Sequence, residues 1–550
     1  MNGLKRFAII LLCLSSLIPG RIQAIPDGKK IFLFPDRNSC LSGDSVWFSV
    51  IIPLDEKVSS NILHVQMVTE NGRLVSSVMK KMASGIVSGY FPVPDSLPTG
   101  VYFLIPFMAP FKPGIRVGTT LFVYNRFDNG INRIPVLPET RKVPFANFAG
   151  TIRIETDKPV YRLRDSVHVI ITLSGKPDDT RLVASAALSD PFADQSGGFS
   201  HFYFENTLPE AFREVEETDG FFVFGKVRKK ADGHPAPALV FLSVPGENPY
   251  SDYFITGKSG DFGFFLKDAF GTGNIIIQVV SADKDDFSVG LNRNLSVKAD
   301  SVKLAVNFLS TEETGNIDDQ VQSYYFQKLF NTVAKPETDS PDMSLRYSIP
   351  FFGKADNGVK PSDYVDLSDF EEVSRELLPG VRFRIKEGEP VIRMVNNQQE
   401  VLFDDEPLRL INGIPVFDNR LLTGLKPSDI ESIQWILKER MFGDLVFKGV
   451  LSIKLKSDDF SWLERTQNTT LFRIACLQPD KTLFRTTETN VLPVNTPDMR
   501  LKYFMRPLFP GTENRFSFRT SDISGEIVIT VRGVNSDNQP FIVEKKIRVE

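Results

Sequence analysis

The sequence predicts a mainly β, multidomain protein, in which a string of β-sandwich domains includes one small α+β domain. Three observations support this. The 550 residues include 46 Phe but only 3 Trp, and Phe favours the half-buried, pleated surface of strands. A strand–turn–strand pattern occurs twice at domain spacing. One stretch, 345–460, instead combines short strands with helix-start signals.

Length and charge limit the possible functions. A chain of 550 residues has room for roughly three to five domains. Its formal net charge of −4 provides no basic field that would recruit nucleic acid. With only 4 His, the commonest metal ligand and general base is scarce. We therefore expect no nucleic-acid partner, no metal, no cofactor and no catalytic residue.

Residues 1–24 are typical of a secretory signal peptide. Lys5 and Arg6 supply the positive start, an apolar core follows, and Ala24 ends a plausible cleavage site. Cys13 would suit a lipoprotein signal, but the Leu before it does not. No later stretch has the ~20 apolar residues that a spanning helix needs. We expect an exported protein without a transmembrane segment of its own.

Two cysteines remain after this cleavage, Cys40 and Cys476. One disulfide does not make a framework. The two residues could pair, but two isolated, partly buried thiols are the favoured interpretation.

An internal repeat is the strongest organisational signal. Residues 29–52 align without a gap on residues 150–173, at an offset of 121 (152 minus 31). Each copy reads as a strand, a polar turn with a fixed Asp, and a second strand led by Asp-Ser-Val. Internal similarity at domain spacing predicts two copies of one sandwich domain. His168 aligns with Trp47, so we expect His168 to be a packed strand residue.

The shared pattern resembles the macroglobulin-like (MG2-type) domain of bacterial alpha-2-macroglobulin relatives. The resemblance implies two such sandwiches, at 25–134 and 148–218, with a loop or insertion at 195–217. The family's covalent protease trap needs a Cys-Gly-Glu-Gln thioester. Neither Cys40 nor Cys476 is followed by Gly-Glu-Gln, so covalent trapping is not expected. The residues that carry the resemblance are Asp36, Asp44, Val46, Asp157, Lys158, Tyr161, Asp165 and Val167.

Residues 219–305 form a third unit of alternating strands and turns. It resembles a carboxypeptidase-regulatory-like domain, an Ig-like accessory module without peptidase residues. A helical linker is expected at 316–344. Its apolar residues recur every four positions, which predicts one packed helix face. That face should contact a sandwich edge or bridge to the next domain, with partner binding as the alternative. The recurring residues are Val321, Tyr325, Leu329 and Val333.

Residues 345–460 carry the α+β domain. Ser368 with Glu371, and Ser428 with Glu431, fit capping boxes that each begin a helix. Strands are expected at 381–385 and 390–395. In the first of these strands Arg382, Arg384 and Lys386 share one face. Such a face is usually solvated, and an anionic partner is the alternative.

Three motifs follow one another in this domain, at 412–415, 425–433 and 443–453. In order and spacing they resemble the plug domain of TonB-dependent outer-membrane receptors. Asn-Gly between apolar runs in the first motif also predicts a hairpin. Asn412 stands where the family usually has Asp. Neither a TonB box nor the receptor's long barrel is recognised, so energy-coupled transport is not expected. The resemblance implies a docking module, whose candidate docking residues are Asn412, Gly413, Pro415, Asp429, Gly443 and Gly449.

Residues 461–550 predict a last sandwich, with strands at 515–519 and 526–534. The resemblances together imply a non-enzymatic structural and interaction protein of the cell envelope. It would be an accessory component of an outer-membrane complex, periplasmic or outer-membrane-associated, with the cell surface as a further option. Candidate partners are outer-membrane proteins such as a TonB-dependent-receptor-like barrel or a lipoprotein. The alternative is a glycan- or peptide-binding module associated with nutrient uptake, with Tyr250 and Tyr253 as stacking aromatics.

Overall fold

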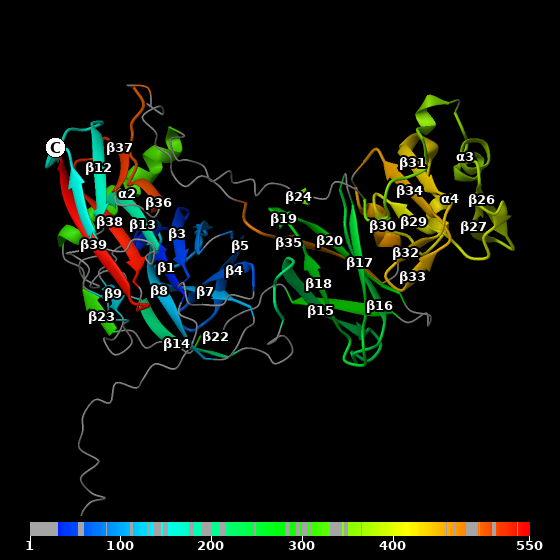
Figure 1. Ribbon diagram of the computed structural model, residues 1–550, viewed down its shortest axis with the longest axis horizontal. Helices are drawn as coiled ribbons and strands as arrows, with labels where there is room; N and C mark the ends of the chain where they lie inside the picture. Colours follow the sequence, from blue (N-terminus) through cyan, green and yellow to red (C-terminus); the bar gives the residue numbers. More distant parts are fainter. Residues whose placement is uncertain are drawn as a thin grey trace, which may run out of the picture.

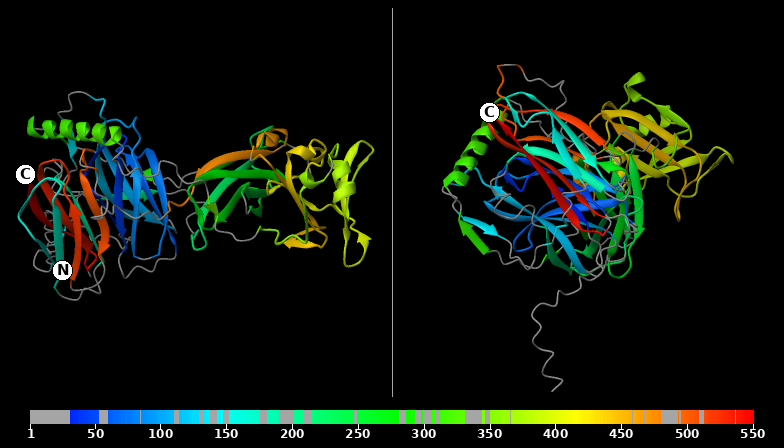
Figure 2. Two further views of the ribbon diagram at one scale, coloured as in Figure 1. Left: turned by 90° about the horizontal axis from the view of Figure 1, so that it is seen from above. Right: turned by 60° about the vertical axis from the view of Figure 1, so that its left-hand side comes forward.

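The computed structural model describes residues 31–550 apart from internal gaps, the longest of which are 53–59, 190–200, 208–214, 331–343 and 480–492. The predicted signal peptide and Cys13 lie outside the described residues. The described chain is mainly β, and the predicted fold class of sandwiches with one small α+β domain is confirmed. Figures 1 and 2 show two sandwiches side by side as a body, from which a third sandwich and the α+β unit extend in a row as an arm.

The first sandwich consists of two facing sheets. One has the order β1-β3-β6, and the other has the order β22-β14-β8-β7-β4-β5 with β2 beside β8. Inward-facing aliphatic side chains such as Leu33, Val50 and Val65 form its core. The strands are β1 (Phe32–Pro35), β2 (Ser39–Leu41), β3 (Ser45–Ile51), β4 (Ile62–Thr69), β5 (Leu74–Lys81), β6 (Ile86–Pro92), β7 (Gly100–Met108), β8 (Gly114–Tyr124), β14 (His201–Thr207) and β22 (Lys298–Ala299).

Strand β14 corrects the prediction of a loop or insertion at 195–217. It pairs antiparallel with β8, with His201 opposite Thr119. The ring nitrogen Nε2 of buried His201 lies 3.0 Å from the carbonyl oxygen of Leu33. Pairing satisfies the backbone groups that the edge of β8 would otherwise present. A segment assigned to the second domain therefore completes the first.

The second sandwich is closed by strands from the C-terminal end. Its sheets have the orders β10-β12-β37 and β11-β39-β38-β13-β36. The early strands leave open edges in both sheets, and the late strands cover them with a shared core that includes Ile171, Tyr503 and Ile529. The strands are β10 (Ile152–Thr156), β11 (Val160–Tyr161), β12 (Ser166–Leu173), β13 (Arg181–Leu188), β36 (Lys502–Leu508), β37 (Glu513–Arg519), β38 (Gly525–Val534) and β39 (Pro540–Val549).

The third sandwich has sheets β18-β15-β21 and β17-β16-β20-β35. Strand β35 pairs with β20 from Gln278 opposite Thr469 to Thr272 opposite Ala475. The predicted separate sandwich at 461–550 is therefore wrong, because its strands divide between the third and the second sandwich. The strands are β15 (Phe221–Lys229), β16 (Leu239–Val244), β17 (Tyr250–Ile255), β18 (Asp261–Leu266), β20 (Thr272–Val280), β21 (Phe287–Asn292) and β35 (Thr469–Ala475).

The small α+β domain, called the α/β unit below, holds a mixed sheet, β25-β31-β34-β29-β30, and a smaller sheet, β26-β27-β28. Two short helices and a hairpin, β32-β33, complete it. Its elements are β25 (Asn357–Val359), η4 (Pro361–Asp363), α3 (Phe370–Leu377), β26 (Val381–Lys386), β27 (Glu389–Asn396), β28 (Val401–Leu402), β29 (Leu408–Ile411), β30 (Ile414–Pro415), α4 (Arg420–Thr423), η5 (Pro427–Asp429), β31 (Ile430–Ile436), β32 (Arg440–Phe442), β33 (Leu445–Phe447), β34 (Val450–Leu455) and the following η6 (Ser461–Arg465).

Both predicted capping boxes differ from the structure. Helix α3 is capped by Asp369, whose carboxylate accepts a hydrogen bond from the amide of Glu372 at 2.8 Å. The Glu372 carboxylate in turn accepts from the amide of Ser368. A side-chain cap and a return hydrogen bond are therefore present, but the cap lies one residue later than predicted, and the return bond goes to the residue before it. Ser428 begins no helix, because after the single turn η5 the chain joins the mixed sheet as β31.

Helix α2 (Thr311–Leu329) packs on an edge of the first sandwich, as predicted for one of the options. Of the predicted face, Val321 packs against the sandwich beside buried Ile317 and Tyr324, whereas Tyr325 and Leu329 are 48% and 76% exposed. The prediction is therefore correct at its first residue and wrong at the next two. A strict four-residue repeat drifts around a helix of 3.6 residues per turn, so it leaves the packed face. Val333 lies outside the described residues. Two small strand pairs remain: β9 (Arg133–Val136) with β23 (Ala305–Phe308), and β19 (Ala269–Phe270) with β24 (Ser344–Leu345).

Candidate docking site

The Asn412-Gly413 turn forms the predicted hairpin between β29 and β30. Both residues have positive φ, 49° and 78°, as a two-residue hairpin turn of this kind requires. The Asn412 side chain also ties the turn to β34: its Oδ1 accepts from the amide of Leu455 at 2.7 Å, and its Nδ2 donates to the carbonyl of Ser457 at 3.1 Å. An Asp at position 412 could accept the first of these bonds but could not donate the second.

This hairpin faces the third sandwich. A side chain at Gly413 would collide with Pro249, 2.0 Å from the position of an added Cβ. The carbonyl of Pro415 accepts a buried hydrogen bond from Nε2 of Gln278 on β20 at 3.0 Å. Ile414 packs with Ile276 of the same strand. The first plug-like motif is therefore occupied by a contact within the chain.

Gly443 faces the third sandwich too. It lies in the turn of the β32–β33 hairpin with φ 57°, and an added Cβ would lie 2.2 Å from the hydroxyl oxygen of Tyr253. That hydroxyl accepts a hydrogen bond from the amide of Asp444 at 2.7 Å, and the ring of Tyr253 lies 5.4 Å from that of Phe442. Tyr253 is thus an interface residue, and Tyr250 packs against the core of its own sandwich. The pair does not form an exposed platform for stacking sugar rings.

The two remaining candidate residues serve the unit itself. Asp429 is exposed in η5, where its carboxylate lies 3.2 Å from the Ser428 hydroxyl. Gly449 has a φ of 101°, and a Cβ atom added to it would lie 2.4 Å from the sulfur of Met394. No side chain therefore fits at this position. The structure thus brings Gly413, Pro415 and Gly443 together at one interface. It does not bring Asp429 or Gly449 to it.

A polar cluster that the sequence did not reveal joins β27 to the mixed sheet. Buried Arg409 forms an ion pair with Glu406, and its Nε donates to the carbonyl of Val416 at 3.0 Å. The side-chain amide of Asn419 donates to the same Glu406 at 2.8 Å and to the carbonyl of Pro390 on β27 at 3.0 Å. The bond from Asn419 to Pro390 reaches the small sheet, and the charge-assisted bonds around Glu406 hold Asn419 in place for it. No local sequence pattern predicts these bonds, because none of the residues that form them belongs to a recognisable motif.

The arm is fastened to the body by polar contacts near its first and last residues. On the way out, Nε2 of His64 lies 2.6 Å from a carboxylate oxygen of fully buried Glu217. On the way back, Nζ of Lys80 donates to the carbonyls of Gln478 at 3.2 Å and Pro479 at 3.1 Å. The side chain of Gln478 exchanges two hydrogen bonds with the backbone of Tyr90. The first and last crossings of the chain between body and arm are therefore both held by polar contacts.

The body has a second buried polar contact, between its two sandwiches. Nζ of Lys502 from β36 lies 3.0 Å from Asp36 and 3.2 Å from Asp44 of the first sandwich. Burial raises the pKa of Asp36, although Lys502 opposes this. Buried Arg532 donates to the carbonyl of Pro35 at 2.7 Å. The repeat motif of the first copy therefore serves as a joint between domains.

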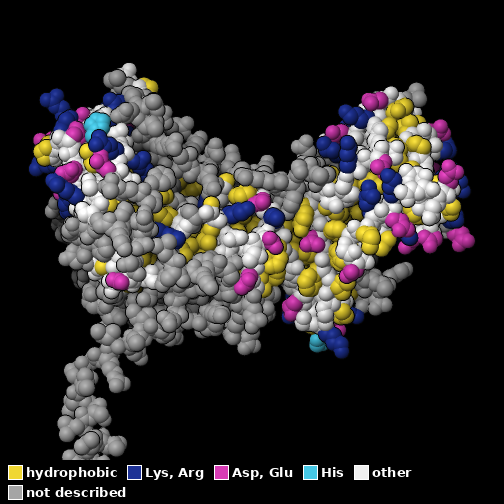
Figure 3. Space-filling view, in the orientation of Figure 1, with side chains coloured by type: hydrophobic (Ala, Val, Ile, Leu, Met, Phe, Trp, Pro, Cys, Tyr) yellow, Lys and Arg dark blue, Asp and Glu magenta, His cyan; other side chains and the backbone are white. Residues whose placement is uncertain are grey.

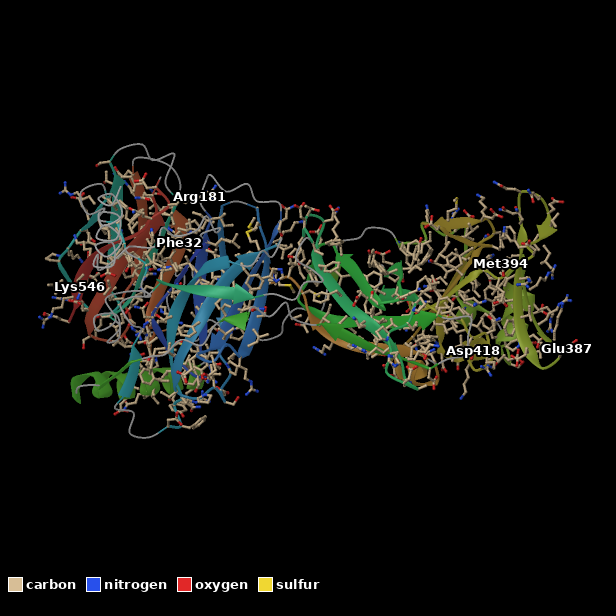
Figure 4. The ribbon with its side chains drawn as sticks, turned by 90° about the horizontal axis from the view of Figure 1, so that it is seen from below. Phe32, Arg181, Glu387, Met394, Asp418 and Lys546 are labelled. Carbon is tan, nitrogen blue, oxygen red and sulfur yellow. The ribbon has the colours of Figure 1, made fainter. Side chains whose placement is uncertain are left out.

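The outward side of the α/β unit is the sheet β26-β27-β28. Figure 4 places Glu387, in the turn between β26 and β27, at the end of the arm farthest from the body. Large apolar side chains are exposed on this sheet, with Ile385 at 54%, Val401 at 58% and Leu402 at 50%. Figure 3 shows apolar side chains on the visible face of this unit, with charges of both signs around its margins.

The described residues contain no group of three or more His, Cys, Asp and Glu that could hold a metal ion. No helix in the described part of the chain is long and apolar enough to cross a membrane. Cys40 and Cys476 are both buried and free, which settles the question of their pairing. Burial raises the pKa of both thiols, that of Cys476 to about 12.

No family model matches the chain, and no curated protein matches it. Among solved structures, it is similar to alpha-2-macroglobulin of Salmonella reacted with methylamine, at 9% identity and a TM-score of 0.23, over 95% of this chain and 39% of that one. The native conformation of Escherichia coli alpha-2-macroglobulin matches at 8% identity and a TM-score of 0.24, over 96% and 40%. An Escherichia coli adhesin matches at 11% identity and a TM-score of 0.13, over 51% and 64%. The chain spans less than half the length of these macroglobulins, and TM-scores this low assign it no family, partner or activity.

Proposed function

We propose that the protein is a non-enzymatic interaction protein of the cell envelope, which docks a partner through the outward side of its α/β unit. The single observation that carries this proposal is the direction in which the unit faces. Gly413, Pro415 and Gly443, from two of its plug-like motifs, contact the third sandwich. The β26-β27-β28 sheet lies on the other side, at the end of the arm.

The arrangement of the arm supports a presenting role. The arm consists of about residues 219–292 and 344–477, and both pieces lie in the sequence between β13 and β36, which are neighbours in one sheet of the second sandwich. Between the two pieces the chain returns to the body, where β22 and α2 lie on the first sandwich. The arm is therefore anchored to the body near its first and last residues. Rigid presentation lowers the entropic cost of binding a partner. The body would then act as the spacer and anchor, and the unit as the contact.

The proposed partner is an outer-membrane protein, either a TonB-dependent-receptor-like barrel or a lipoprotein, and the proposed location is the periplasm or the outer membrane. This part rests on the plug-like motifs and on the signal-peptide pattern. In receptors a plug occupies a barrel. Here the turns at Gly413 and Gly443 are occupied by the third sandwich, so the unit would meet a partner as a surface module.

Affinity purification of the full chain from native envelopes tests the proposal. The wild-type protein should recover an outer-membrane protein, and the variant Val401→Asp/Leu402→Asp on β28 should lose it. The control Val160→Asp/Leu163→Asp makes the same change at exposed apolar residues of the body, each 44% exposed, and should retain it. Recovery of the same partner with both variants would place the contact elsewhere. Recovery of a free monomer from wild type would overturn the proposal.

A further inference from the structure

The β26–β27 hairpin at the end of the arm has two different faces. Its turn, Glu387-Gly388, has φ values of 51° and 85°, and the strands pair from Val381 opposite Met394 to Lys386 opposite Glu389. One face is apolar and packs inward, with the ring of Phe383 5.3 Å from that of Phe370 on helix α3. Because side chains alternate along a strand, the neighbouring residues point the other way, toward solvent.

That outer face carries basic side chains in register. Arg382 lies directly opposite Arg393, and Arg384 and Lys386 follow on the same face of β26, opposite Val391 and Glu389 of β27. Like charges directly opposite each other destabilise a strand pair. The Nη1 atom of Arg393 is also buried and makes no hydrogen bond among the described residues. A buried donor without an acceptor costs about 1–3 kcal/mol, so this pair of arginines is unfavourable within the unit itself.

Six other basic residues of the same unit have acidic partners in the described chain. Within the described part of the chain, no ion pair joins Arg382, Arg384 or Lys386 to an acid. The six are Arg375, Arg409, Arg420, Lys438, Lys448 and Lys454. Lys354, Lys360, Lys426, Arg440 and Lys456 also lack an ion pair in the described chain, so the distinguishing feature of β26 is that three such residues share one face of one strand.

The outer edge of β26 is also open. The amide of Val395 donates to the carbonyl of Gly380, and this bond fixes the alternation of an antiparallel pair. Residues 382, 384 and 386 therefore bond to β27, while the backbone N–H and C=O groups of Phe383 and Ile385 point away from it. In the described chain, β26 pairs with no strand on that side. Open strand edges pair readily with extended segments.

We propose that β26 is a docking strand for an acidic, extended segment of a partner protein. The segment would add a fourth strand beside β26 and hydrogen-bond to Phe383 and Ile385. Side chains at every second position would lie about 5 Å from Arg382 and Arg384, so the segment would carry acids there. The residues between them would be apolar and cover exposed Ile385. This inference rests on the proposed function and identifies the surface and the chemistry of its partner.

The test uses the full chain and a blocked, fluorescent hexapeptide of alternating Glu and Val, with a Lys-Val hexapeptide as the charge control. Binding is measured by fluorescence anisotropy, and strand addition by hydrogen exchange at Phe383 and Ile385. Wild type should bind the Glu-Val peptide, more weakly as salt rises, and protect both amides. The Lys-Val peptide should not bind.

Two variants distinguish the contribution of the basic side chains to binding from that of the open edge of β26. Arg382→Glu/Arg384→Glu should weaken binding at least about tenfold, since it reverses the complementary charges. Ile385→Pro removes an edge N–H and keeps every charge, and it should weaken binding comparably. The control Lys360→Glu/Lys456→Glu makes the same charge change at exposed sites of the same unit and should change binding less than about twofold. Thermal unfolding should show that all variants remain folded, because none of the substituted side chains is buried.

Each outcome decides between explanations. Loss of binding in the charge variant but not in Ile385→Pro, without amide protection, would show a general anion-binding face and overturn strand addition. No binding of the Glu-Val peptide to wild type would mean that the basic residues only guard the edge against aggregation. If the charge variant still recovers its envelope partner while Val401→Asp/Leu402→Asp does not, this inference fails and the proposed function stands.

Discussion

The two copies of the internal repeat share a backbone but not an environment. In the first copy Phe32 pairs with Ile51, and in the second Arg153 pairs with Thr172, which is the same register after the offset of 121 residues. The inner faces of both pairs are apolar and fill their own sandwiches. The outer faces differ. Phe32, Phe34, Trp47 and Ile51 of the first copy are buried against the second sandwich, and their counterparts are Arg153, Glu155, His168 and Thr172.

This difference teaches how a repeated unit acquires a role in assembly. One copy became a strand pair buried on both faces, and the other kept a solvated face. His168 is exposed, so the prediction that it packs like Trp47 is wrong. The alignment of the two copies predicted the strand register correctly, but it could not predict whether the outer face is buried.

The fixed Asp of the motif differs in the same way. In the second copy Asp157 accepts from the hydroxyl of Tyr161 at 2.6 Å and from the amide of His168 at 2.9 Å. In the first copy Asp36 accepts from the amide of Trp47 at 3.2 Å and faces Lys502 of the other sandwich. In the first copy Cys40 occupies the position of Tyr161. Asp36 therefore has no tyrosine hydroxyl as a partner and instead faces the charge of Lys502 from the other sandwich.

The largest expected effect is on the outer face of the first copy. Phe34→Ala should lower the unfolding free energy of the body by about 3–5 kcal/mol, because a fully buried ring is removed. The matched Glu155→Ala change should stay within about 0.5 kcal/mol, as is usual at exposed sites. Hydrogen exchange of the β1 and β10 amides measures both effects. Equal protection losses would contradict the comparison.

The second-largest effect on stability is expected at the buried cation Lys502. Lys502→Met should cost about 3 kcal/mol, because it leaves Asp36 and Asp44 without their shared partner in a buried joint. Lys158→Met breaks only a partly exposed pair with Asp165 and should cost less than about 1 kcal/mol. The readout is denaturant unfolding followed by a probe in each sandwich. A cost for Lys158→Met as large as that for Lys502→Met would show that burial is not the deciding factor.

Tyr161→Phe should have a smaller effect, about 1–2 kcal/mol. The hydroxyl donates to Asp157 and accepts from the amide of Lys158 at 3.0 Å, and its loss leaves both groups short of a partner. The pKa of Tyr161, raised to about 12 by burial and by Asp157, should no longer be detectable in the variant's ultraviolet titration. An unchanged stability would mean that water replaces the hydroxyl.

The smallest energetic effect is expected from acid titration, which should distinguish the two copies by the order in which their carboxylates take up protons. Burial raises the pKa of Asp36, whereas the hydrogen bond from Lys158 lowers the pKa of Asp165. On acidification Asp36 should therefore take up its proton first, which by itself favours the folded state as pH falls. The contribution of Asp165 is present above its ordinary pKa of about 3.9 and is lost as pH falls through its lower folded value. Carboxyl NMR shifts measure the order, and the reverse order would contradict it.

Local sequence signals predicted what local forces determine. The Asn412-Gly413 turn, the alternating strands at 381–385 and 526–534, and the repeat register depend on neighbours in the chain, and the structure has them. The capping box at Ser368 was found one residue early because Asp369 and Glu372 fit the same motif. The short helix predicted at Ser428 failed because pairing with β34 outweighed the cap.

Long-range closure could not be predicted. Strands β12 and β13 each pair with a strand more than 300 residues away, and nothing local in 502–549 shows which open sheet those late strands will cover. The same applies to the candidate docking residues. Gly413 and Gly443 are required by their turns, and the sequence identified them, but it could not show that Pro249 and Tyr253 lie opposite. The open edge of β26 depends equally on a pairing that is absent from the described chain.

Site-specific photo-crosslinking in producing cells tests the central claim most directly. A photoreactive residue at Ile385, on the outward side of the α/β unit, should yield one discrete adduct with an outer-membrane protein. The same residue at Leu163, exposed on the body, should yield none. An adduct from Leu163 with none from Ile385 would contradict docking through the end of the arm.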